Sequence, residues 1–363
     1  MGRAYARPFS YLDLAMFKVG FHDGLAVDPS RPNWSGDGPR PLRWSTWYPA
    51  VEGAAVSSFG VPPAAPLFWM GSVAPGADLS PAAPHYPVVL LSHGTGGTAA
   101  TLGWLACRLA AAGFVVIGVD HHGNTASEPY RPEAFLCWWD RPLDLTAILD
   151  LLAADPRFAG RLDLDRVAAV GFSLGGYTVL SLAGAITDVQ LFTDWAAEGP
   201  VPGGPREFPD IADRVAPLLK SSATFRAAWE RQSEPQGDAR VASVVALAPA
   251  PPVRGFREAS LRGLSHVAVT IATGEADVEA PFEACSAWLQ SLLPNCTLCS
   301  LGAAVGHYQL LGEGTALGLR VMPDIFGDPP GVDRRAVHAA ASRIVLDALQ
   351  GDVPPGPAPK SRS

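Results

Sequence analysis

Residues 167–185, VAAVGFSLGGYTVLSLAGA, form the stretch of sequence that decides the fold. The apolar run from Val167 to Gly171 predicts a buried strand, and the small-residue stretch from Leu174 to Ala185 predicts a helix. Between them lies the pattern Gly-x-Ser-x-Gly, with Ser173 at its centre. A strand, a sharp turn and a helix in this order would expose the Ser173 hydroxyl at the end of a sheet, where it can act as a nucleophile.

Strand and helix signals alternate on both sides of this stretch. Further strands are expected at Val88 to Ser92, Phe114 to Asp120, Val241 to Ala248, Val267 to Thr273 and Cys296 to Leu301. Further helices are expected at about residues 99–112, 139–154, 281–293 and 334–349. Short apolar runs that alternate with helices are typical of βαβ units. The sequence therefore predicts an α/β fold with a mostly parallel central sheet and helices on both faces.

The region before this alternating part is rich in proline. Residues 29–87 contain twelve prolines. Because proline lacks a backbone donor, most of this region is expected to be loop or edge structure. Within it, Leu42 to Tyr48 predicts one strand, and Ala15 to Phe21 is a plausible antiparallel partner.

Two other segments interrupt the alternation. Residues 186–239 hold an acidic loop rich in proline and glycine, followed by a helical stretch around 211–231. An insertion of this size between two strands is expected to form a cap or lid over one end of the sheet. The four prolines after Gly351 predict a disordered tail at 352–363. Residues 1–351 are therefore expected to form a single domain that carries the cap.

The charge balance excludes some classes of partner. The chain has 27 Lys and Arg against 35 Asp and Glu, a net charge of −8, and contains no basic block. This argues against nucleic acid and anionic membrane surfaces as partners. Val167 to Thr187 is uncharged and long enough on paper for a membrane span, but its glycines and hydroxyl residues fit the strand–turn–helix better. Nothing in the sequence tests the oligomeric state.

Cysteine use and the start of the chain favour a cytoplasmic protein. The five cysteines are too few and too scattered for a disulfide framework. Charged residues interrupt the first 24 positions, which lack the apolar run of a signal peptide. Cys296 and Cys299 have the spacing of a redox pair, but on a strand two positions three apart face opposite sides. A dithiol site is therefore not expected.

A base and an acid for the serine hydroxyl follow later strands. His307 lies in a Gly-His-Tyr loop after the last predicted strand, and Asp277 follows the strand that ends at Thr273. A serine hydroxyl needs such a base, and the base needs an acid that fixes its tautomer. The order Ser173, Asp277, His307 is that of an α/β-hydrolase and differs from both common serine-protease orders. Glu275 and Glu279 remain alternatives for the acid.

Two backbone amides are expected to bind the oxyanion of the tetrahedral intermediate. One is the amide of Leu174, directly after the nucleophile. The other is expected from the loop His93-Gly94-Thr95-Gly96-Gly97, with Thr95 as the candidate. Its glycines would let the backbone approach the substrate closely, and His93 is expected to orient the loop.

The sequence also contains residues that could bind a metal ion. The run Asp120-His121-His122 offers possible ligands, but no third ligand at metal spacing accompanies it. Neither a metal nor another cofactor is expected.

Aromatic residues suggest the character of the substrate pocket. Trp138 and Trp139 come from a loop at the same end of the predicted sheet, and Trp195 belongs to the cap. As a group they predict a largely apolar pocket for the acyl or the alcohol part. The alternative is that these side chains only hold the cap onto the sheet.

Together these residues resemble the bacterial dienelactone-hydrolase-like serine esterases related to plasma platelet-activating-factor acetylhydrolase. The resemblance runs from about residue 44 to 349. It rests on the segments Trp47-Tyr48-Pro49, Leu91-Ser92-His93-Gly94, His122-Gly123-Asn124, Arg141-Pro142-x-Asp144, the serine turn, Gly274-x-x-Asp277, Gly306-His307-Tyr308 and Gly331-Val332-Asp333-Arg334. It implies an α/β-hydrolase fold in which Ser173, Asp277 and His307 form the triad. True dienelactone hydrolases carry cysteine at the turn, so lactone chemistry is not implied.

The sequence leads to one main hypothesis and two alternatives. The main one is a serine hydrolase that cleaves small-molecule carboxylic esters through an acyl-enzyme. The first alternative is an acyltransferase or thioesterase of a biosynthetic pathway that uses the same triad. The second is a non-catalytic binding protein that kept the fold and lost the chemistry.

Overall fold

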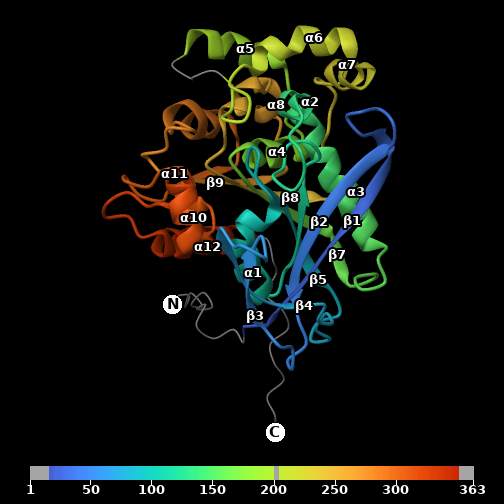
Figure 1. The fold of residues 1–363 in the computed structure, drawn as a ribbon, viewed down its shortest axis with the longest axis vertical. Helices are drawn as coiled ribbons and strands as arrows, with labels where there is room; N and C mark the ends of the chain where they lie inside the picture. Colours follow the sequence, from blue (N-terminus) through green and yellow to red (C-terminus); the bar gives the residue numbers. More distant parts are fainter. Residues whose placement is uncertain (1–15, 200–203, 351–363) are drawn as a thin grey trace, which may run out of the picture.

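The computed structural model describes residues 16–199 and 204–350. They form a mixed sheet with helices against both of its faces (Figure 1). The strands are β1 Val19–Pro32, β2 Pro39–Pro49, β3 Ser57–Val61, β4 Phe68–Pro75, β5 Tyr86–Ser92, β6 Val115–Asp120, β7 Leu162–Phe172, β8 Val241–Leu247, β9 Ala268–Thr273, β10 Cys296–Ser300 and β11 Glu313–Gly314. The tail predicted at 352–363 lies outside the described residues.

The helices follow the strands in close alternation. The α-helices among the described residues are α1 Gly103–Ala111, α2 Pro132–Leu136, α3 Arg141–Ala153, α4 Leu174–Leu182, α5 Val189–Glu198, α6 Val215–Ser221, α7 Ala223–Glu230, α8 Glu258–Arg262, α9 Trp288–Leu292, α10 Ala316–Val321, α11 Pro323–Phe326 and α12 Arg334–Gln350. Short turns of other helix types lie between them: η2 Ala99–Leu102, η3 Trp138–Asp140, η4 Ile211–Arg214, η5 Pro251–Gly255, η6 Glu283–Ala287 and η7 Tyr308–Leu310. Within the described residues, no helix combines the length and apolar character needed to cross a membrane.

The sheet is parallel at its centre. Its strand order is β10-β9-β8-β7-β5-β6-β2-β1-β4-β11, with β3 paired to β4. Strands from β10 to β6 run parallel, and β2 joins β6 antiparallel. Successive residues of β5 belong to different cores: Val88 and Leu90 pack with α3 and α4, whereas Val89 and Leu91 pack with α1 and α12. Both faces of the parallel part are thus buried, as the continuous apolar strands predict.

The proline-rich region forms more strand than the sequence suggested. The antiparallel pair predicted there exists, but β1 continues to Pro32, and β3 and β4 add further strands. The prolines of β2 avoid the part of the strand that is paired on both sides: β6 pairs only with Arg43 to Trp47, and prolines 39, 41 and 49 lie beyond it. Proline is therefore compatible with this strand because no ladder bond on the β6 side is lost.

The insertion at 186–239 contains α5, η4, α6 and α7, and of these α5, α6 and α7 lie together at the top of Figure 1. The single helix expected around 211–231 is interrupted at Ser222, whose extended backbone separates α6 from α7. The Ser222 hydroxyl accepts a hydrogen bond from Phe225 N and so caps α7. Phe225 is fully buried in the core that also contains α3 and α4. The insertion is thus anchored to one face of the sheet.

Parallel pairing brings the predicted site residues to one edge. β5, β7 and β9 all end at this edge, and His93, Ser173 and Asp277 follow them in the sequence. The carboxyl ends of parallel strands are where ligands bind in open α/β sheets. The candidate site is therefore expected at this edge.

Candidate active site

Ser173 lies on a strained turn between β7 and α4. Its backbone φ is 56°, a conformation that residues with a side chain rarely adopt. A Cβ atom on Gly171 would lie 2.0 Å from the carbonyl oxygen of Gly175, and one on Gly175 would lie 2.0 Å from that of Ser92. The two glycines of the Gly-x-Ser-x-Gly pattern are therefore required by the close approach of neighbouring backbone.

The structure brings the three predicted triad residues together. The Ser173 Oγ atom lies 2.9 Å from His307 Nε2, and His307 Nδ1 lies 2.7 Å from Asp277 Oδ2. Because a carboxylate only accepts, Nδ1 carries the hydrogen and Nε2 is free to accept from the serine hydroxyl. The amides of Glu279 and Ala280 donate to Asp277 Oδ1 at 2.9 and 2.7 Å and fix the carboxylate.

The two alternative acids bind elsewhere. Glu279 accepts a hydrogen bond from the Tyr308 hydroxyl at 3.1 Å, and Glu275 accepts one from the Ser300 hydroxyl. Asp277 is therefore the carboxylate that contacts His307.

Two backbone amides next to Ser173 are free to donate. Within the described residues, neither Leu174 N nor Thr95 N has an acceptor. Leu174 N begins α4, where the helix dipole favours negative charge. Gly94 approaches the nucleophile so closely that a Cβ there would lie 3.1 Å from Ser173 Cβ. Leu174 N directly follows the serine and Thr95 N directly follows the glycine that packs against it, and the binding of an oxyanion by these two amides stays a prediction.

A second Ser-His-Asp array, which the sequence did not reveal, begins at Ser92, directly before the loop at residues 93–97. Ser92 Oγ is 3.0 Å from His121 Nε2, and His121 Nδ1 is 2.9 Å from Asp144 Oδ2. Arg31 and Arg40 donate to Asp144 Oδ1, each at 2.7 Å. His121 and the Arg-Pro-x-Asp segment were both noticed in the sequence, but only tertiary folding shows that they belong to one network.

The side chains of Asp120, His121 and His122, the possible metal ligands of the sequence, all have protein partners. Asp120 Oδ1 accepts from Ala99 N at 2.8 Å, and His122 Nδ1 lies 2.6 Å from Glu128 Oε1. Across the described part of the chain, no group of three or more His, Cys, Asp or Glu side chains is arranged to hold a metal ion. All five cysteines are free thiols, the pair at 296 and 299 included.

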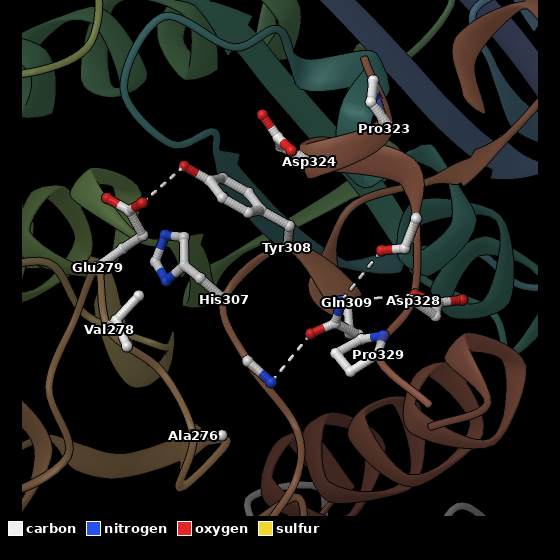
Figure 2. A pocket seen from close by; sticks show the side chains of 12 residues that line it. Ala276, Val278, Glu279, His307, Tyr308, Gln309, Pro323, Asp324, Asp328 and Pro329 are labelled. Carbon is white, nitrogen blue, oxygen red and sulfur yellow. Dashed lines mark hydrogen bonds between the residues drawn. The ribbon is translucent and has the colours of Figure 1, made fainter. Parts of the chain in front are cut away.

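A cleft of about 340 Å³ opens beside His307. Figure 2 shows Tyr308 and Glu279 on one side of it and Asp324 and Asp328 on the other. Burial and then the Glu279 charge raise the pKa of Tyr308 to about 12, so that its hydroxyl remains a donor at neutral pH. The remaining lining residues are Ala276, Val278, Gly306, Gln309, Pro323, Gly327 and Pro329.

The tryptophans expected to contact substrate make packing contacts. Trp139 is fully buried, and its Nε1 donates to Ala228 O of α7 at 2.8 Å. Trp138 packs edge-on against Phe192 of α5. The Arg254 guanidinium lies over the Trp195 ring, 5.5 Å from its centroid. None of the three tryptophans belongs to the lining of the cleft. These contacts hold the insertion onto the sheet, and substrate contact by the tryptophans remains a prediction.

The parallel sheet, the serine on its strained turn and the Ser-His-Asp geometry define an α/β-hydrolase. The chain belongs to the Hydrolase_4 family, described as serine aminopeptidase, S33, whose model matches residues 83–280. The fold class predicted from the sequence is thereby confirmed.

Individual relatives point to esterases over shorter stretches. The chain is 35% identical to cutinase est2 of Thermobifida alba and 36% identical to cutinase cut1 of Thermobifida fusca, each over 107 residues. Each match covers 29% of this chain and 32% or 30% of the cutinase, so the chain spans about a third of these relatives' length. The structure of a ferulic acid esterase from Streptomyces cinnamoneus shares the fold, with a TM-score of 0.61 and 19% identity over 99% of this chain and 96% of that one.

Proposed function

We propose that this protein is a serine hydrolase that cleaves small-molecule carboxylic esters through an acyl-enzyme. The observation that carries the proposal is the unbroken relay from Ser173 Oγ through His307 to Asp277, with contacts of 2.9 and 2.7 Å. The amides of Leu174 and Thr95, which have no acceptor among the described residues, support it. A nucleophile, a base with its orienting acid, and two oxyanion donors are the parts that acyl transfer requires.

In this mechanism His307 Nε2 takes up or returns a proton at each step. Ser173 Oγ attacks the ester carbonyl carbon while its proton moves to His307 Nε2, and Asp277 stabilises the imidazolium that forms. The carbonyl oxygen becomes an oxyanion that accepts from the amides of Thr95 and Leu174. Collapse of the intermediate breaks the ester bond, and Nε2–H protonates the departing alcohol oxygen. Water then attacks the acyl-enzyme carbonyl carbon while His307 Nε2 takes its proton, and the bond to Ser173 Oγ breaks as Nε2–H returns that proton to Oγ and the acid is released.

Ester hydrolysis is favoured over the peptidase activity in the family's description because the individual relatives are cutinases and a ferulic acid esterase. Acyl transfer would proceed through the same acyl-enzyme, and no contact in the structure favours it. A direct comparison of p-nitrophenyl acetate with amino-acid p-nitroanilides distinguishes an esterase from an aminopeptidase.

The proposal extends to the finer points of the sequence analysis. Residues 1–351 act as one domain with 186–239 as a cap, which the buried contacts of Phe225 and Trp139 support. The kinship with the esterases related to platelet-activating-factor acetylhydrolase is supported by the quoted segments. The free cysteines support a cytoplasmic location.

The test is covalent labelling of Ser173. A fluorophosphonate probe should label the full chain at Ser173, and mass spectrometry of the tryptic peptide identifies the residue. Labelling should disappear in Ser173→Ala, whereas Ser181→Ala, which removes a buried hydroxyl later in α4, serves as the matched control. Ester turnover that survives in Ser173→Ala would contradict the proposal.

A further inference from the structure

The peptide that supplies the Thr95 amide is held by its other end. This peptide joins Gly94 to Thr95, so its carbonyl belongs to Gly94 and its N–H to Thr95. The Gly94 carbonyl accepts from His93 Nδ1 at 2.7 Å and from Gly97 N at 3.2 Å. Since the C=O and N–H of a trans peptide point in opposite directions, holding the carbonyl aims the N–H.

The tautomer of His93 follows from its second contact. His93 Nε2 lies 3.1 Å from the backbone N–H of His121 and must accept from it. The hydrogen of the neutral ring is therefore on Nδ1, where it donates to Gly94 O. Burial, and then the charge of Arg141, hold the pKa of His93 well below its usual value, so the ring remains neutral.

Arg141 holds the backbone of His93. Its Nη2 atom donates to the His93 carbonyl oxygen. Within the described residues, Arg141 Nε and Nη1 have no hydrogen-bond partner, although the side chain is only 2% exposed. Asp144, one turn further along α3, has its carboxylate bound by Arg31, Arg40 and His121. The guanidinium is thus buried with a single neutral acceptor.

Such an arrangement costs folding free energy. A buried charge without a contacting counter-ion loses its hydration and recovers little of that loss. Burial lowers the pKa of Arg141 to about 9, opposed by the charges of Asp144 and Tyr177, so the side chain is still protonated at neutral pH. Stability does not explain why a guanidinium occupies this position, but its contact with the oxyanion loop does.

We propose that Arg141 is a positioning residue for the oxyanion site. By holding the His93 carbonyl it fixes His93, whose ring holds the Gly94–Thr95 peptide with the Thr95 N–H aimed at the reacting carbonyl. The inference rests on the proposed esterase function and concerns the same site.

The experiment compares Arg141→Met and Arg141→Lys with the wild-type full chain. A donor that binds only the transition state lowers kcat and leaves KM unchanged when it is displaced. We expect the kcat of Arg141→Met to fall about 100-fold, because a misplacement of the Thr95 N–H by about 1 Å has an effect of this size. The KM of this variant should be unchanged, and the kcat of Arg141→Lys should lie between those of Arg141→Met and the wild type. The Tm of Arg141→Met should equal or exceed that of the wild type, because an uncompensated buried charge is removed.

The second readout is the rate ratio between an ester and its thionoester. Sulfur accepts hydrogen bonds weakly, so a well-aimed Thr95 N–H favours the oxygen ester, and Arg141→Met should lose most of this preference. The matched control is Arg161→Lys. Arg161 also donates to backbone carbonyls, those of Pro84, Ala83 and Ser80, at the opposite end of β7. The register of β7 with β5 places Leu162 opposite Tyr86 and Gly171 opposite Ser92, so about 20 Å of sheet separates Arg161 from the serine turn.

Each outcome has one meaning. A lower Tm with unchanged kcat in Arg141→Met would make Arg141 a purely structural residue and overturn the inference. An ester-to-thionoester rate ratio that is the same in Arg141→Met as in the wild type would also overturn the inference. The proposed function would still stand in that case, because the wild type would still hydrolyse the ester. Absence of ester turnover in the wild type would reject the proposed function itself.

Discussion

This protein contains two Ser-His-Asp arrays of nearly equal geometry. Their serines lie at the ends of the neighbouring strands β5 and β7. In the first, Ser173, His307 and Asp277 are joined by contacts of 2.9 and 2.7 Å. In the second, Ser92, His121 and Asp144 are joined by contacts of 3.0 and 2.9 Å. Only the first is proposed to act on substrate.

Their surroundings differ in three respects. Ser173 is 7% exposed, has a strained backbone and lies beside two free amides, whereas Ser92 is an ordinary strand residue with no exposure. Burial, and then Arg141, lower the pKa of His121 to about 3, which leaves it too weak a base at neutral pH. Burial alone would raise the pKa of Asp144, but Arg40 and Arg31 hold it well below its usual value.

The comparison teaches that triad distances alone do not identify a nucleophile. Access, oxyanion donors and a base of suitable strength are also required. The second array has none of these and instead ties the ends of β5 and β6 to α3. It is best understood as the scaffold beneath the oxyanion loop.

The strongest test of this comparison removes each serine hydroxyl in turn. Ser173→Ala should lower kcat for p-nitrophenyl acetate by about four to six orders of magnitude, because triad members act as a unit. Ser92→Ala loses one buried hydrogen bond of about 1 kcal/mol. That loss corresponds to less than about tenfold in rate. Comparable losses of kcat in the two variants would refute the distinction between the arrays.

A smaller effect is expected from the strained turn that only the first array possesses. In Gly175→Ala the new methyl group would lie 2.0 Å from Ser92 O, so neighbouring backbone must move. We expect the free energy of unfolding to fall by about 3 kcal/mol. Urea denaturation measures it, with Gly53→Ala as the control because a Cβ at Gly53 meets nothing within 4 Å. Equal stabilities of the two variants would show that the turn tolerates a side chain.

The smallest effect, taken per pH unit, concerns the buried base of the second array. Unfolding returns His121 from a pKa of about 3 to its ordinary 6.5, so below pH 6.5 the unfolded chain binds a proton that the folded chain does not. Stability is therefore lost as pH falls from 6.5 toward 3, by about 1.4 kcal/mol per pH unit for this group. His121→Gln should remove that share of the slope, which is measured by urea denaturation of the variant and the wild type at a series of pH values. An unaltered slope in His121→Gln would mean that this ring gains no proton on unfolding.

The prolines show where sequence reasoning fell short, and both they and the tryptophans show the part played by distant segments. The prolines of 29–87 suggested loop or edge structure, yet several of them lie in β2. They occupy the two ends of this strand, and only its middle part is paired with both β1 and β6. Trp138 and Trp139 pack against the helices of the insertion, and their contact with substrate stays a prediction. In both cases the deciding contact comes from a segment distant in the chain.

The sequence by itself determined the parallel part of the sheet, the serine turn and the order of the three predicted triad residues. Each of these rests on local signals: apolar runs for the strands, glycines that a tight turn requires, and polar residues directly after strands. Parallel pairing then brings the strand ends to one edge. The second array, the buried Arg141 and the acidic cleft beside His307 were decided only by tertiary structure. They depend on which side chains from distant segments meet and on how deeply they are buried, and neither is encoded in local spacing.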